Sequence, residues 1–263
     1  MAYAGGGDAE EEEEGEGMDP DLLKKIQDRY MPVKPDKLYS FRTISIGDIA
    51  VDLYCLHHVQ SWENVELGEA VWPSAKILSR YLLDNPDMIR DVHVLELGCG
   101  PGLTGLVAAK LTSQPSSMVL TDNCPLVLEE LVPRSIENNF PNTEDRPKCA
   151  YLHWGSDLPA FHQKYGSFDV ILGADVIYWT EYVEPLIQTV SKLLSPKPSS
   201  CFITIYEERY LKAPDTTVPE MLNIAHKYDL TCTNISLDNN PEYQEARKQE
   251  RCDFKLYSFM QKS

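Results

Sequence analysis

The chain has 263 residues, of which 43% are apolar, and this is enough to bury a substantial core. Its formal net charge of -17 disfavours a nucleic-acid partner, because affinity for a phosphate backbone depends largely on Lys and Arg. The seven cysteines form no Cys-x-x-Cys pair, which argues against a disulfide framework and a zinc site and favours a reducing compartment. The start of the chain has no signal-peptide pattern, and no apolar run reaches the roughly 18 residues of a membrane helix. We therefore expect a cytoplasmic protein, with the nucleus as a second location, and no membrane partner.

The first 21 residues differ in composition from the rest. Residues 1–21 carry nine acidic side chains and no basic one, so we expect a disordered acidic tail. Residues 22–263 are expected to form a single domain, with an N-terminal hairpin and helix extension over 22–90 and a core over 91–263.

The extension begins with two strands, because apolar residues alternate on both sides of Gly47-Asp48 in "YSFRTISIGDIAVDLYCL" and predict a β-hairpin. The segment "EAVWPSAKILSRYLLDN" (69–85) then has the apolar spacing of a helix. Short apolar runs and helical patterns alternate after it, and the predicted elements are strand 92–97, helix 103–112, strand 118–122, helix 125–139, strand 149–154, strand 168–174, helix 182–194, strand 201–206 and helix 217–228. Such alternation predicts an α/β fold in which a parallel sheet has helices on both faces.

The end of the chain departs from this alternation. Two strands, 230–237 and 254–260, are separated by a polar segment in which we expect no helix, so they are predicted to pair antiparallel at the sheet edge. Pro133 is expected to kink helix 125–139 or to start a new turn within it.

A glycine-rich turn follows the first strand of the core. In "VLELGCGPGLTGLVAAK" (94–110), strand, glycine turn and helix N-terminus present unpaired backbone N–H groups, which predicts a nucleotide-like cofactor. The dinucleotide fingerprint G-x-G-x-x-G is not met, because position 103 is leucine, and this disfavours NAD.

Carboxylates accompany this turn at the ends of neighbouring strands. Glu96 precedes the first glycine by two residues, and Asp122 ends the next strand, where a carboxylate can accept ribose hydroxyls. In "FDVILGADVIYWTEY", Asp175 and Tyr178 leave a later strand beside the same crevice. With "AVWPSAKILSRYL" and "LHWGS", this order of motifs resembles methyltransferase family 16, the Asp-x-x-Tyr protein lysine methyltransferases of the seven-β-strand, S-adenosylmethionine-dependent class. The resemblance covers roughly residues 40–260.

The resemblance implies a Rossmann-like, mostly parallel seven-stranded sheet with an antiparallel last strand, and S-adenosylmethionine as the cofactor. It implies that Gly98, Cys99 and Gly100 pass under the methionine part of the cofactor. Glu96 would support this loop, and Asp122 would bind the ribose.

Three further cofactor contacts are implied outside the glycine turn. Trp72 would contact the cofactor from the N-terminal helix, Trp154 would lie against the adenine, and Ala174 would line the pocket floor. Position 135 departs from the family pattern, because related proteins often have Asn where this chain has Ser135.

The implied catalytic residues are Asp175 and Tyr178. Methyl transfer from a sulfonium depends mainly on how the reactants are positioned. Asp175 would therefore bind and orient the substrate lysine rather than act as a strong base. Tyr178 would line the channel through which the lysine enters. Asp175 could instead be only the N-cap of the helix "WTEYVEPL". No metal constellation appears, and the expected protein is a monomer with a protein substrate. Arginine methylation is the main alternative, with a small-molecule methyltransferase and a non-catalytic binding module after it.

Overall fold

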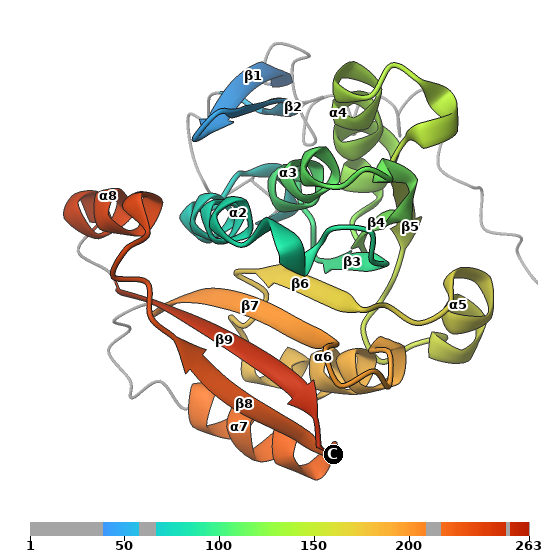
Figure 1. The fold of residues 1–263 in the computed structure, drawn as a ribbon, viewed down its shortest axis with the longest axis vertical. Coiled ribbons are helices and arrows are strands. Elements are labelled where there is room, and N and C mark those ends of the chain that lie inside the picture. Colours follow the sequence, from blue (N-terminus) through green and yellow to red (C-terminus); the bar gives the residue numbers. More distant parts are fainter. Residues whose placement is uncertain (1–38, 58–66, 209–216, 251–252, 263) are drawn as a thin grey trace, which may run out of the picture. The chain divides into compact units, whose positions relative to one another are not determined.

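The computed structural model describes residues 39–57, 67–208, 217–250 and 253–262 (Figure 1). The chain from Tyr39 onward forms one compact unit. The predicted acidic tail over 1–21 lies outside the described residues. None of the helices in the described part of the chain has both the length and the apolar character that crossing a bilayer requires.

A seven-stranded sheet lies at the centre of this unit. In space its strands follow the order β5-β4-β3-β6-β7-β9-β8. Their bounds are β3 (Val94–Leu97), β4 (Met118–Asp122), β5 (Lys148–Tyr151), β6 (Val170–Ala174), β7 (Cys201–Glu208), β8 (Leu230–Ile235) and β9 (Asp253–Gln261). The pairs from β5 to β7 are parallel, whereas β9 runs antiparallel to β7 and to β8. Every residue of β3 and β4 is buried, as expected for parallel strands with helices on both faces. The predicted fold class is confirmed, as is the antiparallel pairing of the last two strands.

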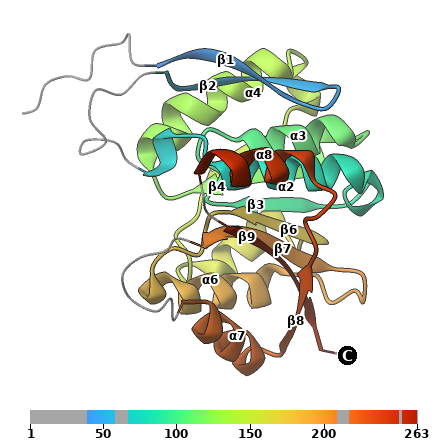
Figure 2. The same ribbon diagram turned by 90° about the vertical axis from the view of Figure 1, so that its left-hand side faces the viewer.

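Helices cover the two faces of the sheet, and the view in Figure 2 separates them. One face carries α2 (Pro73–Asp84), α3 (Leu103–Leu111), α4 (Val132–Asn139) and α8 (Pro241–Glu250). The other carries α6 (Thr180–Leu193) and α7 (Thr217–Lys227). The short helix α5 (Leu158–Tyr165) belongs to this second layer, because Leu158 and Phe161 pack in its apolar cluster. Each layer has its own apolar cluster: Ile77 and Leu106 belong to the first, and Phe168, Leu186 and Phe202 to the second.

The predicted hairpin is confirmed as β1 (Tyr39–Ile46) and β2 (Ile49–Leu56), which pair antiparallel. Side chains of α4 anchor β2. The Tyr54 N–H donates to Ser135 Oγ at 2.9 Å, and Asn139 Nδ2 donates to the Asp52 carbonyl at 2.7 Å. The hairpin is therefore held on the helical layer rather than added to the main sheet.

The structure corrects the sequence analysis at two helices. Residues 158–165 form α5, where no helix was predicted between strands 149–154 and 168–174. This helix is short and buries only Leu158 and Phe161, so its amphipathic pattern is weak.

The polar segment between the last two strands was predicted to have no helix, and this was wrong. It contains α8, which begins at Pro241, directly after Asn240. Asn240 caps the helix, because its Oδ1 accepts the Tyr243 N–H at 2.9 Å while its Nδ2 donates to the Ile77 carbonyl of α2 at 3.0 Å. An Asn-Pro pair is a helix-start signal, and it outweighs the lack of an apolar stripe.

Pro133 behaves as predicted. A π-helical turn over Val127–Leu131 precedes α4, and Pro133 lies in the first turn of α4. Proline has no N–H for the preceding helical turn, and the wider π turn accommodates this loss.

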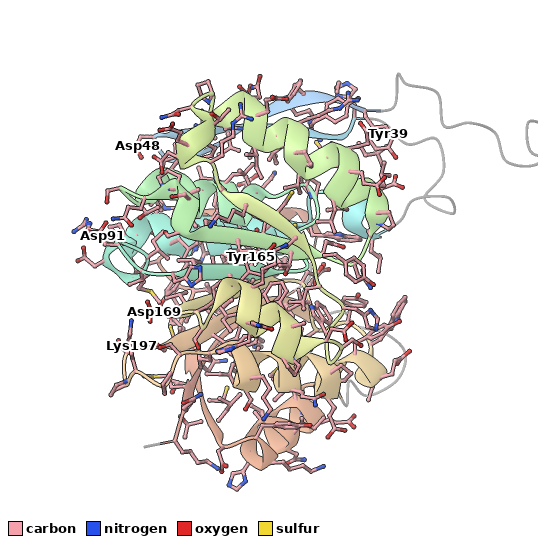
Figure 3. All side chains as sticks on the ribbon, turned by 90° about the vertical axis from the view of Figure 1, so that its right-hand side faces the viewer. Tyr39, Asp48, Asp91, Tyr165, Asp169 and Lys197 are labelled. Carbon is pink, nitrogen blue, oxygen red and sulfur yellow. The ribbon has the colours of Figure 1, made fainter. Side chains whose placement is uncertain are left out.

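The amino ends of the strands lie opposite the site described below. There Lys197 Nζ pairs with Asp169 Oδ1 at 2.7 Å, and Figure 3 shows the two labelled side chains together. The His93 N–H donates to Asp169 Oδ2 at 3.3 Å. This pairing links the segment after α6 to the start of β6.

Candidate active site

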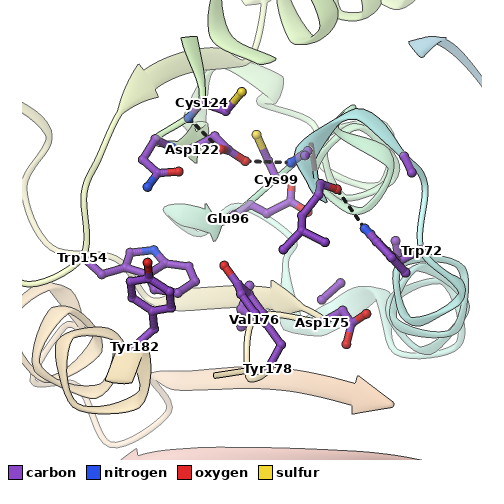
Figure 4. A pocket seen from close by; sticks show the side chains of 18 of the residues that line it. Trp72, Glu96, Cys99, Asp122, Cys124, Trp154, Asp175, Val176, Tyr178 and Tyr182 are labelled. Atoms are coloured by element: carbon purple, nitrogen blue, oxygen red, sulfur yellow. Dashed lines mark hydrogen bonds between the residues drawn. The ribbon is translucent and has the colours of Figure 1, made fainter. Parts of the chain in front are cut away.

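A cavity of about 560 Å³ opens at the carboxyl ends of β3, β4 and β6. Its size is within the range of small-molecule sites in proteins. All ten sequence-predicted site residues line it (Figure 4): Trp72, Glu96, Gly98, Cys99, Gly100, Asp122, Trp154, Ala174, Asp175 and Tyr178.

The glycine turn between β3 and α3 forms the base of the cavity. Gly98 and Gly100 have φ of +62° and +50°, which side chains rarely allow. A Cβ on Gly98 would lie 3.0 Å from Val176 Cγ1 and 3.4 Å from Trp154 Cζ2. The Cys99 N–H donates to the Thr121 carbonyl at 2.9 Å and ties the turn to the end of β4. The absence of side chains thus leaves bare backbone facing the cavity.

Glu96 lies behind the turn and is 2% exposed. Its Oε2 accepts the Gly105 N–H at 2.9 Å, which joins β3 to the first turn of α3. Burial raises the pKa of Glu96 to about 8, although the hydrogen bond from Gly105 opposes this shift. The carboxyl group is therefore largely protonated at pH 7.

Asp122 ends β4 and accepts three backbone hydrogen bonds. Its Oδ2 accepts the Gly100 N–H at 3.0 Å. Its Oδ1 accepts the N–H groups of Asn123 at 2.8 Å and Cys124 at 3.0 Å. Burial raises the pKa of Asp122, and these three hydrogen bonds oppose the rise. A carboxylate has about four acceptor positions, so roughly one remains for a ligand hydroxyl.

The segment before α2 forms a second wall. Trp72 Nε1 donates to the Leu67 carbonyl at 2.9 Å, which closes this short segment on itself. A Cβ on Gly100 would lie 3.4 Å from the Gly68 carbonyl oxygen, so the segment packs directly on the glycine turn. The Tyr39 hydroxyl donates to Glu69 Oε2 at 2.9 Å and connects this wall to the hairpin.

Asp175 follows β6 with an unusual backbone conformation. Its φ is +58°, it is 8% exposed, and its N–H donates to the Ile205 carbonyl at 2.7 Å. A non-glycine residue at positive φ is uncommon, and strain of this kind gathers at functional sites. Helix α6 begins at Thr180 with Trp179 at the N-cap position, so Asp175 lies too early to cap it. The alternative role of Asp175 as a helix cap is therefore wrong.

Tyr178 lies between Asp175 and the wall formed by Trp154 and Tyr182 in Figure 4. Burial raises the pKa of Tyr178, and the neighbouring Tyr182 and two carboxylates raise it further. Its hydroxyl therefore stays neutral at physiological pH.

Some residues that line the cavity were not predicted. They are Leu67, Gly68, Ala70, Val71, Ala75, Pro101, Leu103, Asn123, Cys124, Leu152, His153, Val176, Trp179, Glu181, Tyr182 and Pro185. Trp179 and Tyr182 were within reach of sequence reasoning, because they follow Tyr178 by one and four positions and therefore lie near it. No local pattern marks Leu67–Val71. In the part of the chain that the structure describes, no group of three or more His, Cys, Asp or Glu residues is arranged to hold a metal ion.

Comparison with known proteins identifies the family to which this chain belongs. A family model described as lysine methyltransferase matches residues 52–222. The chain belongs to the lysine methyltransferase family. The family predicted from the motifs is thereby confirmed.

Individual relatives share about a third of their residues with the matched part of this chain. Protein N-lysine methyltransferase METTL21A of Mus musculus is 36% identical over 137 residues, which are 52% of this chain and 60% of that protein. The match thus spans less than two thirds of the mouse relative. Histone-arginine methyltransferase METTL23 of Xenopus laevis is 31% identical over 185 residues, which are 66% of this chain and 69% of that protein.

A solved structure supports the fold of this family member. The T. thermophilus 16S rRNA N2 G1207 methyltransferase (RsmC), in complex with AdoMet and guanosine, aligns with a TM-score of 0.54 at 15% identity. The alignment covers 86% of this chain and 51% of that chain.

Proposed function

We propose that the protein transfers a methyl group from S-adenosylmethionine to the side chain of a lysine in a protein substrate. One observation carries this proposal: a bare glycine turn and the Asp175–Tyr178 segment face the same cavity of about 560 Å³. The family to which the chain belongs supports the reaction and the choice of lysine.

The residues present fit the proposed cofactor. Gly98 and Gly100 leave open the space that a Cβ would fill, and Asp122 retains about one acceptor position for a hydroxyl. Gly98, Cys99 and Gly100 would hold the methionine part, and Asp122 the ribose.

The remaining contacts fall on the walls of the cavity. Trp154 would lie against the adenine, Ala174 would line the floor of the cavity, and Trp72 would contact the cofactor from the N-terminal side. Glu96 supports the glycine turn from behind, because its Oε2 accepts the backbone N–H of Gly105 in the first turn of α3.

The cofactor supplies a methyl group activated by a sulfonium. The chain must present a lysine amine whose lone pair is free and aligned, and this positioning accounts for much of the rate. A carboxylate beside a lysine raises the lysine pKa, so Asp175 attracts and orients the ammonium rather than removing its proton. Tyr178, neutral and partly buried beside Asp175, confines the side chain.

Arginine methylation is the second candidate, and the similarity to METTL23 favours it. The family model and METTL21A favour lysine. We also propose a monomer without a nucleic-acid partner that acts in the cytoplasm or nucleus, on the grounds of charge and cysteine usage.

The test is to incubate the purified full-length chain with a cell extract and S-adenosylmethionine labelled in its methyl group. Mass spectrometry of the labelled protein then locates the modified residue. We expect the label on a lysine. Label on arginine would establish the second candidate, and no enzyme-dependent label on any protein would contradict both.

A further inference from the structure

Three aromatic side chains cluster at the mouth of the cavity, where β6 leads into α6. The ring centroids of Tyr178 and Trp179 are 5.0 Å apart, and those of Trp179 and Tyr182 are 5.8 Å apart. Tyr178 and Tyr182 close the triangle at 6.1 Å. All three line the cavity, and we call them the aromatic mouth. Trp179 and Tyr182 lie outside the Asp-x-x-Tyr motif.

The Trp179 side chain lies outside the buried core. It is 51% exposed, and although it occupies the N-cap position of α6, its side chain makes no capping hydrogen bond. A large aromatic side chain left half in water beside a ligand cavity is a typical contact for a binding partner.

The acidic residues that line the cavity favour a cationic ligand. Asp122, Asp175 and Glu181 line it, whereas Glu96 is largely protonated, and none of the described lining residues is Lys or Arg. Aromatic faces carry negative electrostatic potential and attract organic cations. Aromatic rings together with these carboxylates therefore favour an alkylammonium group.

Methylation of a lysine changes whether carboxylates or aromatic rings bind its ammonium group. An unmodified lysine ammonium has three N–H donors for carboxylates such as Asp175, and each methyl group removes one. A trimethylated ammonium has no donor, but it keeps its charge and is still attracted to aromatic faces. A site built from carboxylates alone would release methylated lysine more readily than one that includes the aromatic mouth.

We propose that the aromatic mouth binds the cationic head of the substrate lysine and retains its methylated forms, so that one lysine undergoes successive transfers. This inference rests on the proposed function, and it assigns Trp179 and Tyr182 as the residues that set the number of methyl groups added. Each transfer forms one N–C bond from the amine lone pair and breaks the C–S bond, whose electrons stay on sulfur. The resulting methylammonium releases a proton to solvent before the next transfer. After the third transfer the nitrogen carries no proton.

Direct binding tests the mouth without any transfer. The full-length protein, labelled with ¹⁵N, is titrated with the N-acetyl methylamide of trimethyllysine, and the indole N–H resonance of Trp179 is followed. Its assignment comes from its loss in Trp179→Phe. The comparison ligand is the neutral analogue with carbon in place of the quaternary nitrogen. We expect the charged probe to bind about three- to tenfold more tightly than its neutral analogue.

Single substitutions show which residues cause the preference for the charged probe. Trp179→Ala and Tyr182→Ala should each weaken binding of the charged probe about three- to tenfold, whereas Trp179→Phe and Tyr182→Phe, which keep a ring, should stay within about twofold. Tyr151→Ala is the matched control, because Tyr151 is 62% exposed on β5 and does not line this cavity. Equal binding of charged and neutral probes by the native chain would overturn the inference even if an alanine variant failed to fold. Unchanged affinity in both folded alanine variants would overturn it as well.

The methylation state of the labelled lysine is the second readout. Trp179→Ala should shift its products from the di- and trimethylated forms toward the monomethylated form. A native chain that methylates no protein would contradict the proposed function, even if the probe binds. A native chain that methylates protein but does not discriminate between the probes would contradict only the inference about the mouth.

Discussion

Asp122 joins the end of β4 to the glycine turn through three backbone hydrogen bonds. We predict that Asp122→Ala weakens S-adenosylmethionine binding by about 1.5–3 kcal/mol, because one charged acceptor for a ribose hydroxyl is lost. Calorimetric titration measures this change. Melting curves without cofactor show whether the variant stays folded, since three N–H groups also lose their acceptor. Unchanged affinity in a folded variant would remove Asp122 from the cofactor site.

Asp175 lies beside Tyr178, where we place the substrate lysine (Figure 4). We predict that Asp175→Asn leaves cofactor affinity nearly unchanged and lowers turnover by about two orders of magnitude or more, as for loss of a group that orients a reactant. The measurements are cofactor titration and the transfer rate to the identified substrate. Full activity in this variant would refute substrate capture by Asp175 and leave Tyr178 and the channel walls as candidates.

Glu96 makes stability depend on pH. Its pKa is about 8 in the folded chain against an ordinary value of 4.5, so between these values the unfolded state releases a proton that the folded state retains. This contribution to stability is complete below pH 4.5 and is lost as the pH rises toward 8, with a slope of at most about 1.4 kcal/mol per pH unit. We expect Glu96→Gln to flatten this part of the stability profile. Urea unfolding at several pH values checks the prediction, and equal slopes in the two proteins would contradict it.

At the scale of the element, the hairpin depends on Ser135 of α4. This hydroxyl is fully buried, accepts the Tyr54 N–H at 2.9 Å and donates to the Leu131 carbonyl at 2.8 Å. Ser135→Ala should cost about 1–3 kcal/mol of stability, because the N–H of β2 loses its acceptor. Chemical denaturation measures the loss. Ser236→Ala is the control, since its hydroxyl donates to Asp238 Oδ2 at 2.8 Å and accepts the Asp238 N–H at 3.2 Å, both in exposed contacts. An equal effect of both variants would contradict the anchoring role.

At the scale of the whole molecule, the division of the chain at the acidic tail stays a prediction. A chain that starts at Asp19 should melt within a few degrees of the full-length protein, because a solvated run of charges buries little apolar surface. Calorimetric melting of both chains makes the comparison. Loss of cooperative unfolding in the shorter chain would mean that the tail packs against the domain.

The sequence by itself determined the sheet, the glycine turn and the residues that converge on the cavity. Each of these depends on local patterns: a buried apolar strand, a turn that needs glycine, and a carboxylate just after a strand. Because the carboxyl ends of parallel strands meet at one edge, their local order was enough to bring Glu96, Asp122 and Asp175 to the same place.

Only the tertiary structure decided the N-terminal wall of the cavity and the position of α8. Asn240 bonds to a carbonyl 163 residues earlier, and Tyr39 reaches Glu69 across 30 residues. Such pairings leave no periodic trace in the sequence, because each depends on where two separately formed elements meet. The same holds for the carboxylates of the cavity, since Asp122, Asp175 and Glu181 come together around it only once the sheet is assembled.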